Sequence, residues 1–218
     1  MLSFLTDSLA SLIYPQFCGV CGRLVEKSSD GAACAECWSN TKIFGDLDRL
    51  CQKCGLFLVE SDVETTNTCG QCSDHAYDTA QSSGVYGNAL AASILHLKRV
   101  PLMPVRIKEL LVRTLDRAKL TGDYLIVPVP LSKKRLIERG FNQSSLLGKV
   151  LSAHTGWKCD EHSLIRTGDT PMHRAAMDRF AREATVKKAF SVVRPGLIKG
   201  KDILLVDDLF TSGATASN

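Results

Sequence analysis

Eight of the nine cysteines form four pairs, each with the spacing C-x-x-C. Two thiolates placed three residues apart on a tight turn can bind one metal ion, and repeated pairs of this kind are typical of tetrahedral zinc sites. Coordination by four thiolates leaves no position for water, so we predict structural zinc. The pairs are Cys18/Cys21, Cys34/Cys37, Cys51/Cys54 and Cys69/Cys72.

The order of the pairs predicts two sites of four cysteines each. Gly22 and Gly55 each follow a pair directly, so the pattern C-x-x-C-G…C-x-x-C occurs twice. Glycine lets such a turn point backbone N–H groups at sulfur. An interleaved grouping, the first pair with the third and the second with the fourth, stays open. A redox C-x-x-C pair is a further alternative, but it would need a βαβ context that this region lacks. The expected ligand sets are Cys18, Cys21, Cys34 and Cys37 for one zinc, and Cys51, Cys54, Cys69 and Cys72 for the other.

A second candidate site follows residues 203–206, whose sequence I-L-L-V is typical of a buried parallel strand. Two acids come next, and then a turn rich in hydroxyl groups. Backbone N–H groups in such a turn bind phosphate, whereas adjacent carboxylates suit a pair of sugar hydroxyls. The pattern predicts a site for a sugar 5-phosphate, and the missing P-loop lysine disfavours a nucleoside triphosphatase. The alternative is that the acids only cap the strand. The site residues would be Asp207, Asp208, Thr211, Ser212, Gly213, Ala214 and Thr215.

Alternating apolar patterns predict the elements that position these residues. Apolar periodicity favours helices over 88–98, 107–120 and 141–151, and strands over 83–86, 124–129 and 203–206. Strands that alternate with helices indicate an α/β fold with a parallel sheet flanked by helices, in which ligands bind beyond the carboxyl ends of the strands. Lys133, Lys134 and Arg135 follow the strand at 124–129, and we expect them in a basic loop at the same crevice.

Charge separates two modules. Residues 1–75 carry 10 acidic and 5 basic side chains, for a net charge of −5, whereas residues 76–218 carry 13 and 22, for a net charge of +9. The basic module should therefore meet an anion. We predict an amphipathic helix over 1–15, a double zinc ribbon over 16–75 and an α/β domain over 80–218 whose C-terminus is incomplete.

The sequence pattern argues against a targeting or membrane segment. No basic residue precedes Arg23, and no run of 18 apolar residues occurs. We therefore expect a cytoplasmic protein without membrane insertion, in a reducing compartment where thiolates bind metal. Cys159, beside Trp157, is expected to be a buried thiol.

Four segments together resemble the ComF/GntX family, a double zinc ribbon followed by a type I phosphoribosyltransferase domain. They are Y-G-N-A-L…L-H-L-K at 86–98, V-P-V-P-L-S at 127–132, R-G-F-N-Q at 139–143, and residues 203–215. The resemblance implies that the catalytic residues Asp207 and Asp208 hold the ribose hydroxyls of phosphoribosyl pyrophosphate (PRPP), with Mg²⁺ nearby. It also implies that residues 211–215 wrap the 5-phosphate. Candidates for binding the pyrophosphate are Lys98, Lys133, Lys134, Arg135 and Arg139.

The segment at 164–190 resembles the part of this family that lies over the active site. His173 stands where the family usually has Gln, and Glu183-Ala184 stand near its usual Asn. We expect a lid that excludes water, with His173 as a candidate general base.

Two functions follow from the resemblance. One is a phosphoribosyltransferase that releases pyrophosphate. The alternative is a non-catalytic competence factor that binds single-stranded DNA and a ComF-type helicase-like ATPase, although few aromatic residues lie near the basic cluster to stack on bases.

Overall fold

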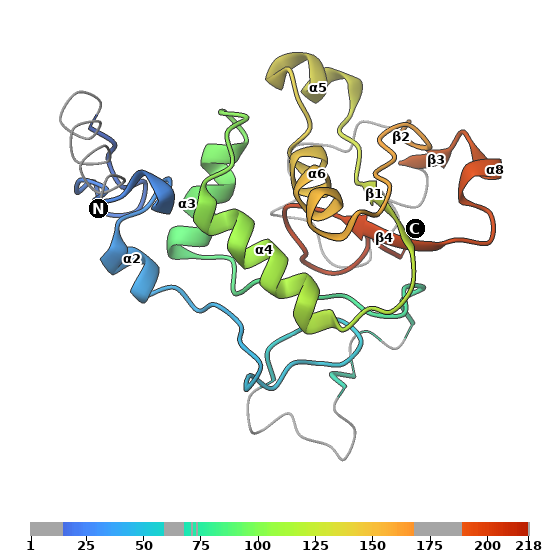
Figure 1. The fold of residues 1–218 in the computed structure, drawn as a ribbon, viewed down its shortest axis with the longest axis horizontal. Coiled ribbons are helices and arrows are strands. Elements are labelled where there is room, and N and C mark those ends of the chain that lie inside the picture. The colour runs from blue at the N-terminus through green and yellow to red at the C-terminus, as the bar shows by residue number, and fades with distance from the viewer. Residues whose placement is uncertain (1–14, 59–67, 71, 73, 168–188, 218) are drawn as a thin grey trace. The chain divides into compact units, whose positions relative to one another are not determined.

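The computed structural model describes residues 15–58, 68–70, 72, 74–167 and 189–217. The chain forms two compact units, and each combines two separate stretches of sequence (Figure 1). The first draws on Met1–Gly45 and Ser83–Lys119, and the second on Asp46–Ser82 and Leu120–Asn218. Each unit therefore contains one cluster of four cysteines and part of the chain that follows the ribbons. The boundaries at 16–75 and 80–218 stay a prediction, and the helix expected over 1–15 lies almost wholly outside the described residues.

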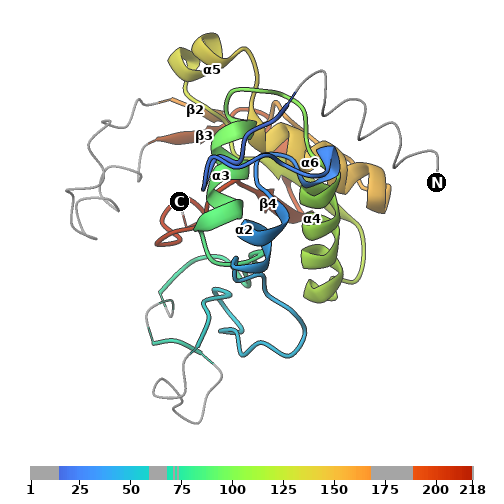
Figure 2. The same ribbon diagram turned by 90° about the vertical axis from the view of Figure 1, so that its left-hand side faces the viewer.

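The first unit is built from short helices around the first set of cysteines. Its elements are the 3-10 helix η1 (Ser28–Asp30) and the α-helices α2 (Ala35–Ser39), α3 (Asn88–Leu97) and α4 (Val105–Ala118). Helix α2 packs on α3 (Figure 2), and η1 packs on α4. The predictions of helices at 88–98 and 107–120 are confirmed, with α4 beginning directly after Pro104.

The prediction of a strand at 83–86 is wrong. Only an isolated antiparallel bridge forms there, between Ile43 and Gly84. Two backbone hydrogen bonds hold it, from Phe44 N–H to the Ser83 carbonyl (2.9 Å) and from Val85 N–H to the Lys42 carbonyl (3.0 Å). The pairing stops because the chain turns at 86–87 into helix α3.

A partly buried ion pair links the first ribbon to helix α4. Asp30 is 7% exposed, and its carboxylate lies 2.9 Å from the guanidinium of Arg106. That guanidinium also lies 4.6 Å from the ring centroid of Trp38, a cation–π distance. The indole N–H of Trp38 donates to the Asp30 carbonyl at 3.0 Å. One arginine therefore satisfies a buried carboxylate and covers the largest buried side chain of this unit.

The second unit contains a parallel pair of strands, β1 (Tyr124–Pro128) and β4 (Asp202–Val206), in register from Tyr124↔Asp202 to Pro128↔Val206. Helix α6 (Gln143–Thr155) lies against both strands. A further parallel bridge joins Ile126 to Cys159. These elements confirm the α/β class, the two strands and the helix expected near 141–151.

Other elements of this unit were not expected. Lys133–Arg139 form helix α5 where a basic loop was predicted, because the Ser132 hydroxyl caps the first turn by accepting from Arg135 N–H at 3.4 Å. Strands β2 (Leu164–Arg166) and β3 (Phe190–Val192) pair antiparallel, and helix α8 (Pro195–Ile198) follows.

The two faces of the β1–β4 pair differ in what covers them. Gly148 of α6 packs against Ile126 and Pro128. Because side chains alternate along a strand, Val127 and Leu205 point to the opposite face, where they line a pocket of about 250 Å³ with residues of β2 and β3. No helix among the described residues is both long and apolar enough to span a membrane.

We predict that Arg106→Leu lowers the free energy of unfolding of the chain by about 3 kcal/mol, because it leaves the buried carboxylate of Asp30 without its cation. Urea unfolding measures the change. Arg113→Leu is the matched control, since Arg113 is exposed on the same helix and its loss should cost less than about 0.5 kcal/mol. Equal effects of the two substitutions would contradict a role for the ion pair.

Candidate functional site

The two C-x-x-C-G turns have the same backbone hydrogen bonds. In each turn, the N–H of the first cysteine donates to the carbonyl five residues later, and the glycine N–H donates back to the carbonyl of the first cysteine. Both glycines have positive φ, 75° for Gly22 and 68° for Gly55, as such a turn requires. The internal repeat expected from the sequence is therefore present in the backbone. The bonds are Cys18 to Arg23 (2.7 Å), Gly22 to Cys18 (2.9 Å), Cys51 to Leu56 (2.8 Å) and Gly55 to Cys51 (2.8 Å).

The sulfur atoms form two groups of four, and within each group the sulfurs lie within 4.8 Å of one another. A tetrahedral site with Zn–S bonds near 2.3 Å separates its sulfurs by about 3.8 Å. Two of the separations come near this value: Cys21 to Cys34 is 3.6 Å, and Cys51 to Cys72 is 3.6 Å. The donor sets therefore fit zinc. The predicted sequential grouping is confirmed, and the interleaved grouping is wrong.

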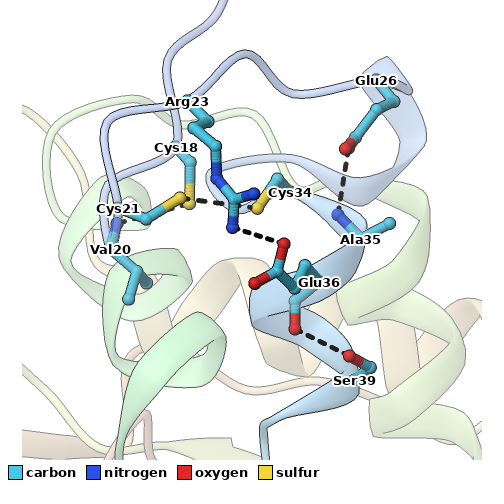
Figure 3. Close-up of polar contacts among 9 residues, drawn as sticks. All are labelled: Cys18, Val20, Cys21, Arg23, Glu26, Cys34, Ala35, Glu36 and Ser39. Atoms are coloured by element: carbon cyan, nitrogen blue, oxygen red, sulfur yellow. Dashed lines mark hydrogen bonds and ion pairs between the residues drawn. The ribbon is translucent and has the colours of Figure 1, made fainter.

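Charged side chains lie beside the first four-cysteine site, three of whose cysteines are drawn in Figure 3. A hydrogen bond from the Arg23 side chain lowers the pKa of the Cys21 thiol to about 6. Arg23 also pairs with Glu36 at 2.5 Å, but both side chains are well exposed, so this pair adds little stability. Because four thiolates around Zn²⁺ leave a net charge of −2, the guanidinium reduces the local excess of negative charge.

Backbone donors support the same site. Burial opposes ionisation of Cys18, but backbone hydrogen bonds outweigh it and lower the pKa of this thiol. One donor is Val20 N–H, 3.4 Å from the Cys18 sulfur. Glu26 caps helix α2 by accepting from Ala35 N–H at 3.0 Å, which lowers the pKa of Glu26 (Figure 3).

The second four-cysteine site is more deeply enclosed. Cys51 is completely buried, and its sulfur accepts from the Cys69 N–H at 3.2 Å. The Cys54 and Cys69 sulfurs are 3.3 Å apart. Burial raises the pKa of Cys72 to about 11. The only other buried side chain in this cluster, among the described residues, is Leu58. Metal coordination therefore replaces an apolar core here.

The two adjacent acids lie directly after the carboxyl end of strand β4. The Ser144 hydroxyl donates to Asp207 Oδ1 at 3.1 Å, and Asp208 N–H donates to the same oxygen at 2.9 Å. Asn142 fixes this end of α6, because its side chain accepts from Ser144 N–H (3.2 Å) and donates to the Val129 carbonyl (3.0 Å). The R-G-F-N-Q segment thus begins a helix at the strand ends.

Ser144 was not among the predicted site residues. The signal that could have found it is Asn142 two residues earlier, since an N-cap asparagine after a strand-end loop marks a helix that starts near the sheet edge.

The carboxyl group of Asp207 is hard to ionise. Its removal from bulk water raises the pKa to about 7, and the negative charge of Asp208 acts in the same direction. The residue as a whole is nevertheless exposed. The charge of Asp208 is therefore the firmer cause of the raised pKa, because it acts independently of burial.

Residues after the acids form a turn. Gly213 has φ 75°, and its carbonyl accepts from the N–H groups of Ala216 and Ser217, both at 3.0 Å. The side-chain position of Gly213 faces two residues that sequence reasoning missed, His75 and Tyr77. No local signal marks them, because they precede the turn by more than a hundred residues. Four backbone N–H groups find no acceptor among the described residues, those of Thr211, Ser212, Gly213 and Thr215.

The predicted pyrophosphate ligands fall in different elements. Lys133, Lys134, Arg135 and Arg139 all belong to α5 of the second unit, whereas Lys98 ends α3 in the first. Their role stays a prediction. His173 and residues 168–188 of the lid expected over 164–190 lie outside the described residues, so the lid stays a prediction. Cys159 is half-buried, and burial raises its pKa, as expected for an unreactive thiol.

The fold and the two four-cysteine sites define a zinc-ribbon protein with an α/β unit. Residues 9–73 match the family model described as "Double zinc ribbon domain". The chain is 30% identical over 176 residues to "DNA utilization protein YhgH" of Escherichia coli O6:H1, covering 77% of this chain and 74% of the relative. The chain belongs to the ComF/GntX family.

Two further relatives support this assignment. "DNA utilization protein YhgH" of Escherichia coli K12 is 29% identical over 215 residues, which covers 94% of this chain and 89% of that protein. "Competence protein ComFC" of Bacillus subtilis is 34% identical over 92 residues, covering 42% of this chain and 35% of that protein. No solved structure matches the chain.

We predict that the purified chain carries two zinc ions and that Cys21→Ser reduces the number to one, because the first site loses a thiolate ligand. Native mass spectrometry measures the stoichiometry. Cys159→Ser is the control, since Cys159 belongs to neither sulfur cluster. Retention of two zinc ions by Cys21→Ser would show that Cys21 is not a ligand.

A second prediction concerns pH. A raised carboxyl pKa means that Asp207 contributes stability that is complete below its unfolded-state pKa, near 4, and is lost as pH rises through about 7. Asp207→Asn avoids this loss. The variant should exceed the wild type in unfolding free energy by about 1 kcal/mol at pH 8, a value reduced for solvent screening, and the gain should shrink towards pH 4. Asp202→Asn, at the other end of β4, controls for removing one negative charge. A gain that does not vary with pH would contradict the shift.

Proposed function

We propose that the chain binds PRPP together with Mg²⁺ and transfers its phosphoribosyl group to an acceptor with release of pyrophosphate. The main support is the position of Asp207 and Asp208. They follow the carboxyl end of a parallel strand, where α/β proteins bind ligands. One of them is anchored by Ser144. Next comes a turn whose backbone N–H groups at 211–213 and 215 have no acceptor within the described part of the chain.

Each part of PRPP has chemically suited partners in this proposal. The two carboxylates accept hydrogen bonds from the ribose hydroxyls. Carboxylate oxygens are also ligands that Mg²⁺ prefers. The N–H groups and hydroxyls of residues 211–215 suit the 5-phosphate. Basic side chains of α5 suit the pyrophosphate.

The reaction breaks the bond between ribose C1 and the pyrophosphate oxygen, and the electron pair leaves with pyrophosphate. The lone pair of the acceptor forms the new bond at C1, and the acceptor loses its proton to solvent. Positive charge grows on the ribose in the transition state, and the paired carboxylates beside the ring stabilise it. Mg²⁺, arriving with PRPP, supplies charge neutralisation of the leaving group.

A second candidate function is DNA binding in competence, alongside a helicase-like ATPase. Relatives named for DNA utilization and competence favour it. The net charge of +9 over residues 76–218 suits a polyanion, and Lys133 and Lys134 are exposed on α5. This candidate needs no chemistry at Asp207.

We predict that the wild-type chain binds PRPP in the presence of Mg²⁺ and that Asp207→Asn/Asp208→Asn weakens binding about a hundredfold, because two charged acceptors of hydrogen bonds are lost. Isothermal titration calorimetry measures the Kd. Asp123→Asn is the control, since this exposed acid directly precedes β1 and so lies at the opposite end of the parallel strands from Asp207.

Pyrophosphate release with candidate acceptors then separates binding from catalysis. The proposal fails if the wild type does not bind PRPP at millimolar concentration. Salt-dependent binding of a labelled single strand that survives in the double variant would assign DNA binding to a separate surface.

A further inference from the structure

Two polar side chains converge on the turn after β4. His75 Nδ1 and the Tyr77 hydroxyl are both buried, and neither has a hydrogen-bond partner among the described residues. A side-chain carbon placed on Gly213 would lie 2.6 Å from His75 Nδ1 and 2.9 Å from the Tyr77 hydroxyl. The two atoms therefore approach the same point of the turn, and only glycine leaves room for them.

Ring packing holds both side chains in place. The His75 and Tyr77 ring centroids are 5.2 Å apart, and Tyr77 meets Phe210 edge-on at 5.9 Å. Phe210 belongs to the stretch between the paired acids and the turn. Burying unpaired polar groups has a free-energy cost, and a fixed arrangement that leaves two of them at one place is typical of a ligand site.

The second four-cysteine site supports the segment that carries these side chains, residues 74–80. His75 N–H donates to the Cys72 carbonyl at 3.2 Å, and Ala80 N–H donates to the Lys53 carbonyl at 2.7 Å. The Thr79 hydroxyl donates to the Gln52 carbonyl at 3.0 Å. Gln52 and Lys53 lie between the two cysteines of one C-x-x-C pair. The segment is thus attached at both ends to the residues that hold the metal.

The same segment is also bonded to the turn itself. Ala76 N–H donates to the Ser217 hydroxyl at 3.3 Å, a contact between residues 141 positions apart. All of these residues belong to the second compact unit.

We propose that His75 and Tyr77 donate hydrogen bonds to the phosphate group of the ligand held at residues 211–215, with the second zinc ribbon positioning them. An imidazole N–H and a phenol O–H are donors, and phosphate oxygens are strong acceptors. The inference rests on the proposed function, because it assigns partners to the ligand of that same site. It gives the second ribbon a part in binding beyond its own stability.

The test uses the full zinc-loaded chain and ribose 5-phosphate, which carries the phosphate but no pyrophosphate. His75→Phe and Tyr77→Phe keep the rings and remove the donors. Each substitution should raise the Kd for ribose 5-phosphate about tenfold, because one hydrogen bond to a charged group is lost. Calorimetry measures the Kd. His75→Asn, which keeps an amide N–H near the position of Nδ1, should restore most of the affinity.

Matched controls are Tyr86→Phe and His162→Gln, both at exposed positions, and they should leave the Kd unchanged. All variants should retain two zinc ions per chain by mass spectrometry, which separates lost donors from a lost ribbon. Unchanged affinity in His75→Phe and Tyr77→Phe, with wild-type binding intact, would overturn this inference and leave the proposed function standing. Absence of wild-type binding to both ribose 5-phosphate and PRPP would overturn both.

Discussion

Thiolate coordination is the constraint on which both units depend. Among the described residues of the second ribbon, the buried cluster consists of the cysteines and Leu58. This is far too little apolar surface to offset the entropy of ordering that stretch. Instead, the four sulfur atoms of each site lie close enough together to bind one metal ion. The backbone of each C-x-x-C-G turn holds its two cysteines in this arrangement. Metal binding and folding are therefore one process in these segments.

Each ribbon is tied to a different part of the chain. The first is joined to α4 through the Asp30–Arg106 pair and the Trp38 ring. The second is joined to the residues after β4 through the Tyr77–Phe210 ring contact and the Ala76–Ser217 hydrogen bond. The double ribbon is thus continuous in sequence but divided in structure. Losing metal at one site would be felt first in the unit that contains it.

The end of β4 illustrates the conflict between stability and function. Two adjacent carboxylates repel each other, and among the described residues the side chain that contacts Asp207 is the hydroxyl of Ser144 at a helix end. Two carboxylates that disfavour each other's ionisation at the end of a strand are typical of a site that binds hydroxyl groups or a divalent ion.

Local pattern determined much of this protein. The C-x-x-C-G spacing specifies each metal turn, and apolar periodicity specifies α3, α4, α6, β1 and β4, because these depend on residues a few positions apart. Tertiary structure alone decided the partners of Asp207 and Gly213: Ser144 lies 63 positions from Asp207. It also decided the pairing of β2 with β3 and the division into units. Such contacts depend on how distant segments pack together, and no spacing within one segment carries that information.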